Sequence, residues 1–233
     1  MHRRGSGHAM PLPPRVPHDA LMRALYLHGF ASSPESGKAV RIADAVRALG
    51  VATHVPDLNL PDFRSLTITR MLAQVRDAID AEPGSPVVLI GSSLGAFVAL
   101  HAAAHSAVRG LVLLAPALDF GVDESDRIGD VSIGDWRASG SCEVFHYAWN
   151  RRETLDFSLY EDARRYDAFA AAPAVPVLIF QGRRDTVVSP AVVERWAAGR
   201  PGVTLVMLDD DHQLHASLDV IAQGLRAFVA RLL

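Results

Sequence analysis

Short apolar runs alternate with longer amphipathic segments along most of the chain. The apolar runs are bounded by Gly, Pro, Asp or His and have the length of strands buried on both faces; they fall at residues 22–27, 51–55, 86–90, 110–114, 175–180 and 203–208. Apolar residues at helical spacing occupy residues 38–49, 67–81, 94–105, 190–198 and 216–232. Strands that alternate with helices predict an α/β protein, with a mostly parallel sheet of about six strands and helices on both faces.

One interval, between Leu114 and Val175, breaks the alternation. It contains nine of the sixteen aromatic residues of the chain. Phe145, Tyr147 and Trp149 occupy alternate positions, and a second alternating run follows after a polar interruption. This pattern predicts a β-hairpin.

The whole insertion, about residues 116–172, is expected to form a cap or lid, because long segments of this kind in compact domains are usually functional. Ser158 and Glu161 have the spacing of a capping box, which predicts a helix to about Ala170. The alternative is a structural excursion whose aromatic residues pack onto the main core. The candidates for lining a substrate pocket are Phe145, Tyr147 and Trp149.

Composition places the chain among ordinary globular proteins. Of 233 residues, 49% are hydrophobic and 21% are charged, and the formal net charge is −3. No basic stripe is visible, so nucleic acid is not an expected partner. A single cysteine excludes an intrachain disulfide and favours a cytoplasmic location, and no apolar run reaches the length of a membrane span.

The first twenty residues differ from the rest of the sequence. Residues 1–20 are rich in proline, glycine, arginine and histidine, and they lack the apolar stretch of a signal peptide. They are predicted to form a flexible tail. Residues 21–233 are then expected to form one domain that carries the cap insertion.

The sequence VVLIGSSLGAF, which begins at Val87, places two serines between glycines at the end of a predicted buried strand. In an open parallel sheet, ligands bind beyond the carboxyl ends of the strands. Gly91, Ser93 and Gly95 form a G-x-S-x-G motif between that strand and a helix. Such a turn holds the central serine in a strained conformation with its oxygen above the sheet, which indicates a nucleophile.

A nucleophilic serine needs a base and an orienting carboxylate, and on this fold they follow in the order Ser, Asp, His. Asp185 follows the fifth predicted strand, and His212 follows the sixth. Asp185 is expected to fix the tautomer of His212, although a helix-terminal or surface ion-pair role is the alternative. His215 competes with His212 for the role of base, but it lies farther from the strand end.

Acyl transfer also requires donors for the developing oxyanion. The N–H of Leu94, which follows the nucleophile, is the first candidate. The second comes from the loop after the first strand, where Gly29 permits a close backbone approach and the Phe30 N–H is the expected donor. His28 in the same loop is expected to be a buried structural histidine.

The segments YLHGFASSPESGKA, LIGSSLGAFVAL, LLAPAL, FQGRRDTVVSP and DDDHQL resemble the α/β-hydrolase superfamily, and most of all the small bacterial YqiA/YcfP-like esterases. The resemblance implies hydrolysis of carboxylic esters or acyl thioesters, with a small-molecule substrate and no cofactor. It also implies a catalytic triad of Ser93, Asp185 and His212 and an oxyanion hole at Phe30 and Leu94. The cap, which is longer than a minimal member needs, leaves the acyl preference open.

Other motifs in the sequence give weaker indications. His101 and His105 have the spacing of a metal pair on a helix but lack the glutamate of the zinc protease motif. The acidic run at residues 209–211 lacks the spacing of a calcium loop, and GSSLG lacks the lysine of a phosphate-binding loop. A serine peptidase or acyltransferase uses the same triad, and an inactive binding protein can keep the same fold.

Overall fold

The structure, a computed structural model, describes residues 21–122, 127–128 and 131–233. The tail predicted at residues 1–20 lies outside the described residues. As predicted, the central sheet has six parallel strands; their order is β10-β9-β4-β3-β1-β2. Their bounds are β1 Arg23–Leu27, β2 Ala52–His54, β3 Val87–Ser92, β4 Val108–Leu114, β9 Val177–Gly182 and β10 Val203–Leu208.

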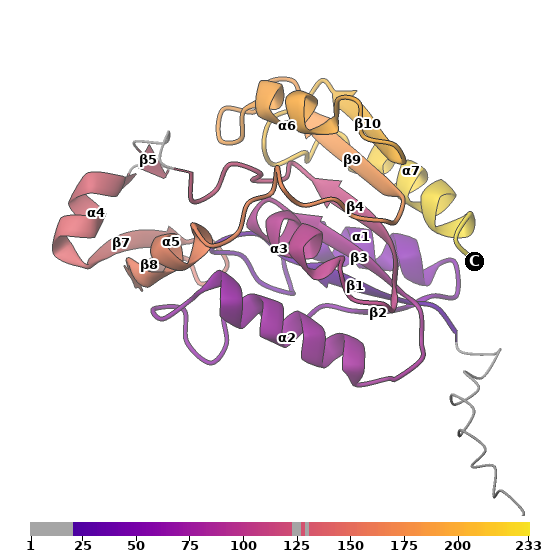
Figure 1. Cartoon of the computed structure of the whole chain (residues 1–233), viewed down its shortest axis with the longest axis horizontal. Helices are drawn as coiled ribbons and strands as arrows, with labels where there is room; N and C mark the ends of the chain where they lie inside the picture. Colours follow the sequence, from indigo (N-terminus) through magenta and orange to yellow (C-terminus); the bar gives the residue numbers. More distant parts are fainter. Residues whose placement is uncertain (1–20, 123–126, 129–130) are drawn as a thin grey trace, which may run out of the picture.

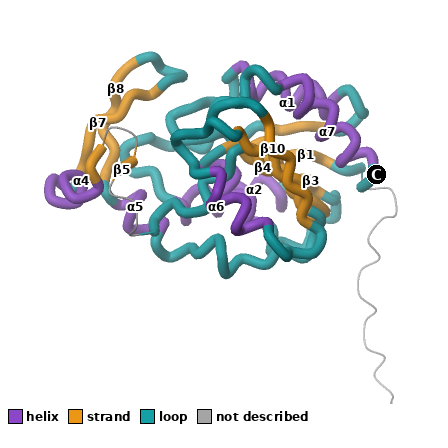
Figure 2. Tube along the Cα trace, turned by 90° about the horizontal axis from the view of Figure 1, so that it is seen from above, coloured by secondary structure: helices purple, strands orange, loops and turns teal. Residues whose placement is uncertain are grey.

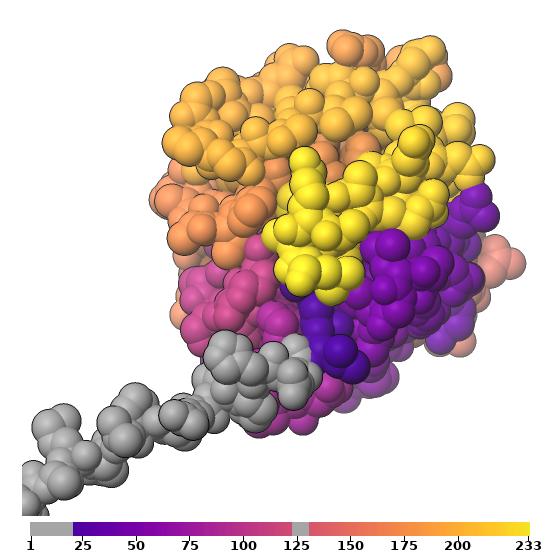
Figure 3. All heavy atoms as spheres, turned by 90° about the vertical axis from the view of Figure 1, so that its right-hand side faces the viewer, coloured from indigo at the N-terminus to yellow at the C-terminus, as the bar shows by residue number. Residues whose placement is uncertain are grey.

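Helices cover both faces of this sheet (Figure 1). On one face, α2 (Ile68–Asp80), α3 (Leu94–Ala102) and α6 (Pro190–Ala197) contribute to one apolar cluster. On the other face, α1 (Gly37–Arg47) and α7 (Leu218–Ala230) contribute to a second cluster. In Figure 3 the surface of the C-terminal residues (yellow) adjoins that of residues early in the described chain (purple). The five helices predicted between the strands of the sheet and after the last one are confirmed, with ends that differ by at most three residues.

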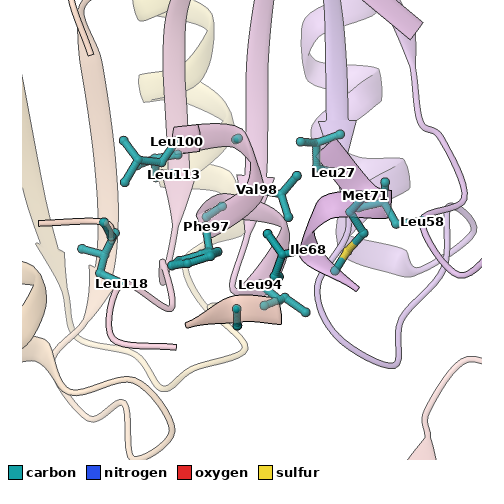
Figure 4. Packing of buried hydrophobic residues seen from close by; sticks show 14 of the residues in the cluster. Leu27, Leu58, Ile68, Met71, Leu94, Phe97, Val98, Leu100, Leu113 and Leu118 are labelled. Carbon is teal, nitrogen blue, oxygen red and sulfur yellow. The ribbon is translucent and has the colours of Figure 1, made fainter. Parts of the chain in front are cut away.

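Buried apolar side chains surround α3, which packs on the sheet next to α2. Leu94, Phe97 and Val98 of α3 are almost fully buried and lie between strand residues and α2 (Figure 4). Leu113 of β4 and Met71 of α2 belong to the same cluster. Because α3 is apolar on all sides, it is held on the sheet by burial, and its first residue is fixed directly after β3.

The insertion forms a group of elements on the side of the molecule away from the C-terminus (Figures 1 and 2). It contains a predicted hairpin, which the structure confirms, and a helix before the hairpin that the sequence pattern did not indicate. The elements are β5 Arg127–Ile128, β6 Val131–Ser132, α4 Ile133–Ser139, β7 Ser141–His146, β8 Arg151–Asp156 and α5 Ser158–Ala163.

Part of the insertion packs onto the core, as the structural alternative proposed. The rings of Trp136, Phe157 and Tyr160 are buried and contact one another, and the Trp136 indole N–H donates to the Leu155 carbonyl at 3.0 Å. At the start of α2, the Thr69 N–H donates to a carboxylate oxygen of the insertion at 2.6 Å. The base of the cap is therefore continuous with the main core.

The predicted capping box at Ser158 is wrong. Phe157 is the N-cap residue of α5, and Ser158 is already helical. The Phe157 ring is buried against Trp136, at 5.3 Å between ring centroids, so tertiary packing sets where the helix begins. The helix also ends at Ala163 rather than near Ala170, after which the chain continues in turns.

The hairpin turn also differs in position from the prediction. β7 ends at His146, so Tyr147 and Trp149 belong to the turn rather than to the strand. Asn150 in this turn has a φ of 50°, a left-handed conformation that asparagine tolerates. His146, not its neighbour Phe145, faces the buried side of the hairpin.

Candidate active site

Ser93 lies at a strained turn between β3 and α3. Its φ of 53° and ψ of −117° are rare for a residue with a side chain, and such conformations cost on the order of 1–3 kcal/mol. A Cβ on Gly91 would lie 2.4 Å from the Gly95 carbonyl oxygen, and a Cβ on Gly95 would lie 2.2 Å from that of Leu27. Glycine at both positions is therefore what lets the chain fold back so sharply.

His212 joins the serine to the aspartate. Its Nε2 lies 3.1 Å from the Ser93 Oγ, and its Nδ1 lies 2.9 Å from the Asp185 Oδ2. A carboxylate accepts hydrogen bonds, so Nδ1 carries the proton and the Nε2 of the neutral ring is free to accept from the serine hydroxyl. The structure thus brings the three predicted residues into one hydrogen-bonded chain.

Asp185 is held rigidly in its own turn after β9. Its Oδ1 accepts from the N–H groups of Val187 and Val188, at 2.9 and 2.8 Å. Burial by itself would raise the pKa of the Asp185 carboxyl, but the hydrogen bonds from His212 and the two backbone amides hold that pKa below its ordinary value. The carboxylate is therefore ionised and aimed at the imidazole.

Gln181, near the end of β9, is a partner that the sequence analysis missed. It is fully buried, and its Nε2 donates to the Asp185 Oδ2 at 2.9 Å. The only signal in the sequence was a glutamine at the end of an otherwise apolar strand. It orients the same oxygen that His212 contacts.

The loop that carries His212 is fixed to the turn that carries Asp185. The Arg184 N–H donates to the Asp210 carbonyl at 3.0 Å, and the Asp210 Oδ2 accepts from the Ser217 N–H at 2.8 Å. Burial would raise the pKa of the Asp210 carboxyl, but its backbone hydrogen bonds lower it. Among the described histidines, only His212 hydrogen bonds to Ser93, so His215 takes no part in this chain.

The loop after β1 lies against the serine turn. A Cβ on Gly29 would lie 3.2 Å from the Ser92 carbonyl oxygen and 3.4 Å from the Ser93 Cβ. Within the described part of the chain, no hydrogen bond uses the N–H of Phe30 or of Leu94. Both predicted donors are thus available beside the serine.

The remaining histidines have structural surroundings. His28 is buried, with its Nδ1 2.9 Å from the Gly29 carbonyl and its Nε2 accepting from the Leu58 N–H at 3.0 Å. The His101 ring packs against Phe97, and His105 hydrogen bonds to a carboxylate at 3.0 Å. The described residues include no cluster of three or more His, Cys, Asp or Glu side chains arranged to hold a metal ion.

The tip of the β7–β8 hairpin reaches the same region. The Tyr147 N–H donates to the Ala31 carbonyl at 3.0 Å, directly after the loop that carries Phe30. The exposed fractions of Phe145, Tyr147 and Trp149 are 40%, 74% and 38%. The hairpin therefore presents open aromatic rings near the candidate site rather than a closed wall.

A cluster of aromatic rings around the buried Phe63 and His146 holds this tip in place. The Trp149 ring stacks on His146 at 3.8 Å, and the His146 ring meets Phe63 edge-on at 4.8 Å. Phe63 in turn lies 5.5 Å from Phe30, between ring centroids. Packing thus connects the hairpin to the loop after β1.

These features define an α/β-hydrolase fold: six parallel strands, a strained serine turn after β3, and an aspartate and a histidine after β9 and β10. The chain belongs to the Uncharacterised protein family (UPF0227), whose family model matches residues 23–229. This is the YqiA/YcfP-like family that the sequence motifs indicated. No curated protein is significantly similar to the chain.

Solved structures of α/β-hydrolases share this fold. Est1E from Butyrivibrio proteoclasticus, with ferulic acid bound, has 18% identity and a TM-score of 0.82, over 95% of this chain and 93% of that one. The mouse alpha/beta hydrolase domain-containing protein 10 has 21% identity and a TM-score of 0.73, over 95% and 93%. The esterase domain of a Rhodothermus marinus protein has 21% identity and a TM-score of 0.67, over 93% and 90%.

These neighbours are esterases and other hydrolases, and the likeness at such identities is one of fold. None of the helices formed by the described residues combines the length and the apolar character needed to cross a membrane.

Proposed function

We propose that this protein is a serine hydrolase that cleaves carboxylic esters or acyl thioesters through an acyl-enzyme on Ser93. The observation that carries the proposal is the hydrogen-bonded chain from Ser93 through His212 to Asp185, with the serine at a strained strand-to-helix turn. A serine with only a structural role in a tight turn would not require a histidine and an aspartate aligned on its hydroxyl. A buried, ionised aspartate on a histidine is an arrangement that activates a hydroxyl.

The reaction proceeds in two acyl transfers. His212 accepts the proton of the Ser93 hydroxyl at Nε2 while the Ser93 oxygen attacks the acyl carbonyl, and Asp185 stabilises the imidazolium through Nδ1. The imidazolium then protonates the leaving alcohol or thiol, and the acyl group remains on the serine. Water, deprotonated by the same nitrogen, attacks the acyl-serine and releases the acid.

The oxyanion of each tetrahedral intermediate is bound by the N–H groups of Leu94 and Phe30. Two observations support this assignment: the Leu94 N–H opens helix α3, and neither amide is used by another hydrogen bond of the described residues. The helix adds a positive dipole at its N-terminus. Fixed donors of this kind typically contribute 10²–10³-fold each to turnover.

The acyl group of the substrate lies along the hairpin tip, against Phe145, Tyr147 and Trp149. This proposal rests on the bond from the Tyr147 N–H to the loop after β1, which keeps the turn close to the serine. Their partial exposure leaves apolar surface for a ligand to cover. Bound apolar groups gain about 25 cal/mol for each Å² that they remove from water.

The test is a parallel assay of one acyl series as esters, thioesters and peptide amides. The series includes an aromatic acid, because Est1E holds ferulic acid. We expect turnover of esters or thioesters by the wild type and none by Ser93→Ala. Cleavage of the amides alone would instead indicate a peptidase, acyl transfer to an added alcohol without hydrolysis would indicate an acyltransferase, and a wild type that does not react with a fluorophosphonate would indicate a binding protein.

A further inference from the structure

The chain contains a single lysine. All the other basic side chains among its 23 lysine and arginine residues are arginines, so the one departure, Lys38, stands out. Lysine carries a compact ammonium that fits a confined site, whereas the arginine guanidinium is a wide planar fork. Because arginine occupies every other basic position, the surroundings of Lys38 should show why a compact ammonium is needed there.

Lys38 contacts the serine turn from helix α1. It is the second residue of α1, is only partly exposed, and its Nζ donates to the Ser92 Oγ at 3.3 Å. Ser92 is buried and immediately precedes Ser93. The Ser92 hydroxyl also interacts with the phenol of Tyr26, a buried residue of β1. One ammonium thus holds the residue from which the strained turn begins.

The charges that face Lys38 are the carboxylates of the candidate site. Asp211 and Asp210, in the loop after β10, attract its positive charge, and so does Asp185 in the turn after β9. Tyr26, from β1, stays protonated because burial raises its pKa. Burial lowers the pKa of Lys38 to about 8, while the three carboxylates act to raise it. None of the described carboxylates lies within the 4.0 Å of an ion pair with it.

Helix stability does not explain a lysine here. The ammonium lies in the first turn of α1, where the helix dipole disfavours a cation, and that turn contains no acidic residue. Desolvation also penalises the charge. A methionine would keep the apolar stem at this position without that penalty.

We propose that Lys38 is a positioning residue of the site. Its ammonium fixes the hydroxyl of Ser92, the residue before the nucleophile, and partly neutralises the negative charge of the carboxylates around His212. This inference rests on the proposed function, because it assigns a role in preparing His212 as base. A cation near the Asp185–His212 pair disfavours the imidazolium. Lys38 therefore favours the neutral imidazole, which is the form that accepts the serine proton.

The first test measures ionisation and needs no substrate. Lysine labelled with ¹⁵N at Nζ gives one side-chain signal in this chain, and we expect its titration near pH 8. The His212 C–H signal, assigned with His212→Ala, should titrate about 0.5–1 pH unit higher in Lys38→Met than in the wild type. Lys38→Arg, which keeps the positive charge, should restore most of the wild-type value.

The second test follows the rate at which a fluorophosphonate labels Ser93 as a function of pH. The acid limb of this profile should move upward by the same 0.5–1 unit in Lys38→Met and return in Lys38→Arg. Arg41→Met is the matched control, because Arg41 lies on the same helix, with a side chain 56% exposed and paired with Asp219. Its profile should coincide with that of the wild type.

Thermal unfolding separates this role from a structural one. The unfolded chain binds more protons than the folded chain between about pH 8 and the ordinary lysine pKa, so wild-type stability should rise with pH through that window. Lys38→Met should lack this rise and unfold at a higher temperature than the wild type at pH 7. A lysine whose charged contact stabilises the fold would give the opposite result, because Lys38→Met would then unfold at a lower temperature than the wild type.

Two results would overturn the inference: a His212 signal unchanged in Lys38→Met, or an equal shift in Arg41→Met. If Lys38→Met does not fold, Lys38→Gln replaces it in both tests, with the same expected shift. A wild type that titrates as expected but is not labelled at Ser93 would contradict the proposed function instead, so the two failures are distinguishable.

Discussion

The serine turn and the β7–β8 hairpin meet at the loop after β1, but they are built in opposite ways. At the serine turn, glycines in backbone contact fix the chain, and Asp185 is buried with four hydrogen bonds to its two oxygens. At the hairpin tip, Tyr147 is 74% exposed and one backbone hydrogen bond reaches the body. In the proposed enzyme, the chemistry would rest on a rigid frame, whereas substrate preference would rest on an exposed surface that tolerates change.

The largest expected effect separates the two serines of the turn. Ser93→Ala should lower turnover by about 10⁶-fold if the three residues act as a unit. Ser92→Ala should retain most activity at neutral pH, because Ser92 supplies no reacting atom. Steady-state kinetics of both variants on one ester measures this difference. Loss of turnover in Ser92→Ala with survival in Ser93→Ala would show that the nucleophile is assigned to the wrong residue.

The second prediction separates the two neighbouring histidines. His212→Ala should abolish turnover to a similar extent, while His215→Ala should be mild, since only His212 hydrogen bonds to Ser93 among the described histidines. In the wild type, activity should rise with pH on the acid side of the profile, because the imidazole must be neutral to accept the proton. Equal and severe losses in both variants would remove the basis for assigning the base.

The third prediction concerns the buried carboxylate. Asp185→Asn should lower kcat by about 10⁴-fold with little change in KM, because the amide presents a donor to the imidazole and favours the wrong tautomer. Circular dichroism should show that the fold persists, since the asparagine oxygen can still accept from the Val187 and Val188 amides. A loss smaller than tenfold in a folded variant would contradict the role of Asp185.

The fourth and smallest effect is expected at the hairpin. Phe145→Ala combined with Trp149→Ala should reduce kcat/KM for long acyl esters more than for acetate esters. Each buried methylene contributes about 0.8 kcal/mol, so four methylenes correspond to roughly two orders of magnitude. Val220→Ala, an exposed apolar residue of α7, is the control and should leave the chain-length profile unchanged.

Two outcomes would separate the hairpin from the acyl site. A uniform loss at all chain lengths would indicate damage to the cluster that joins Trp149 to His146 and Phe63. An unchanged profile in a folded double variant would show that the acyl group lies elsewhere.

Much of the frame was predictable because each part leaves a local signal in the sequence. The six strands are apolar runs between breakers, and the G-x-S-x-G motif follows one of them directly. Asp185 and His212 were predictable as residues that follow later strands, since parallel strands bring their carboxyl ends to one edge. The order of strands and helices along the sequence was therefore enough to predict that Ser93, Asp185 and His212 lie at the same edge of the sheet.

The parts that were missed depend on how the chain folds around the site. Gln181 has the sequence context of a strand residue, and only the turn after β9 brings Asp185, four residues later, to its amide. Lys38 has the sequence context of a helix residue, and only tertiary packing brings it to Ser92. The alternation in β7 could not reveal which face is buried, and the structure buries His146 rather than Phe145. Packing of Phe157 against Trp136 likewise displaced the predicted start of α5.

The most direct test of the central claim is the mass of the acyl-enzyme. The protein is mixed with an activated ester, quenched in acid within its first turnovers and digested. We predict that the peptide containing Ser93 gains the mass of the acyl group, and that this gain is absent in Ser93→Ala and accumulates in a variant that deacylates slowly. Ester turnover with no acylated peptide, or acylation at Ser92, would contradict the account.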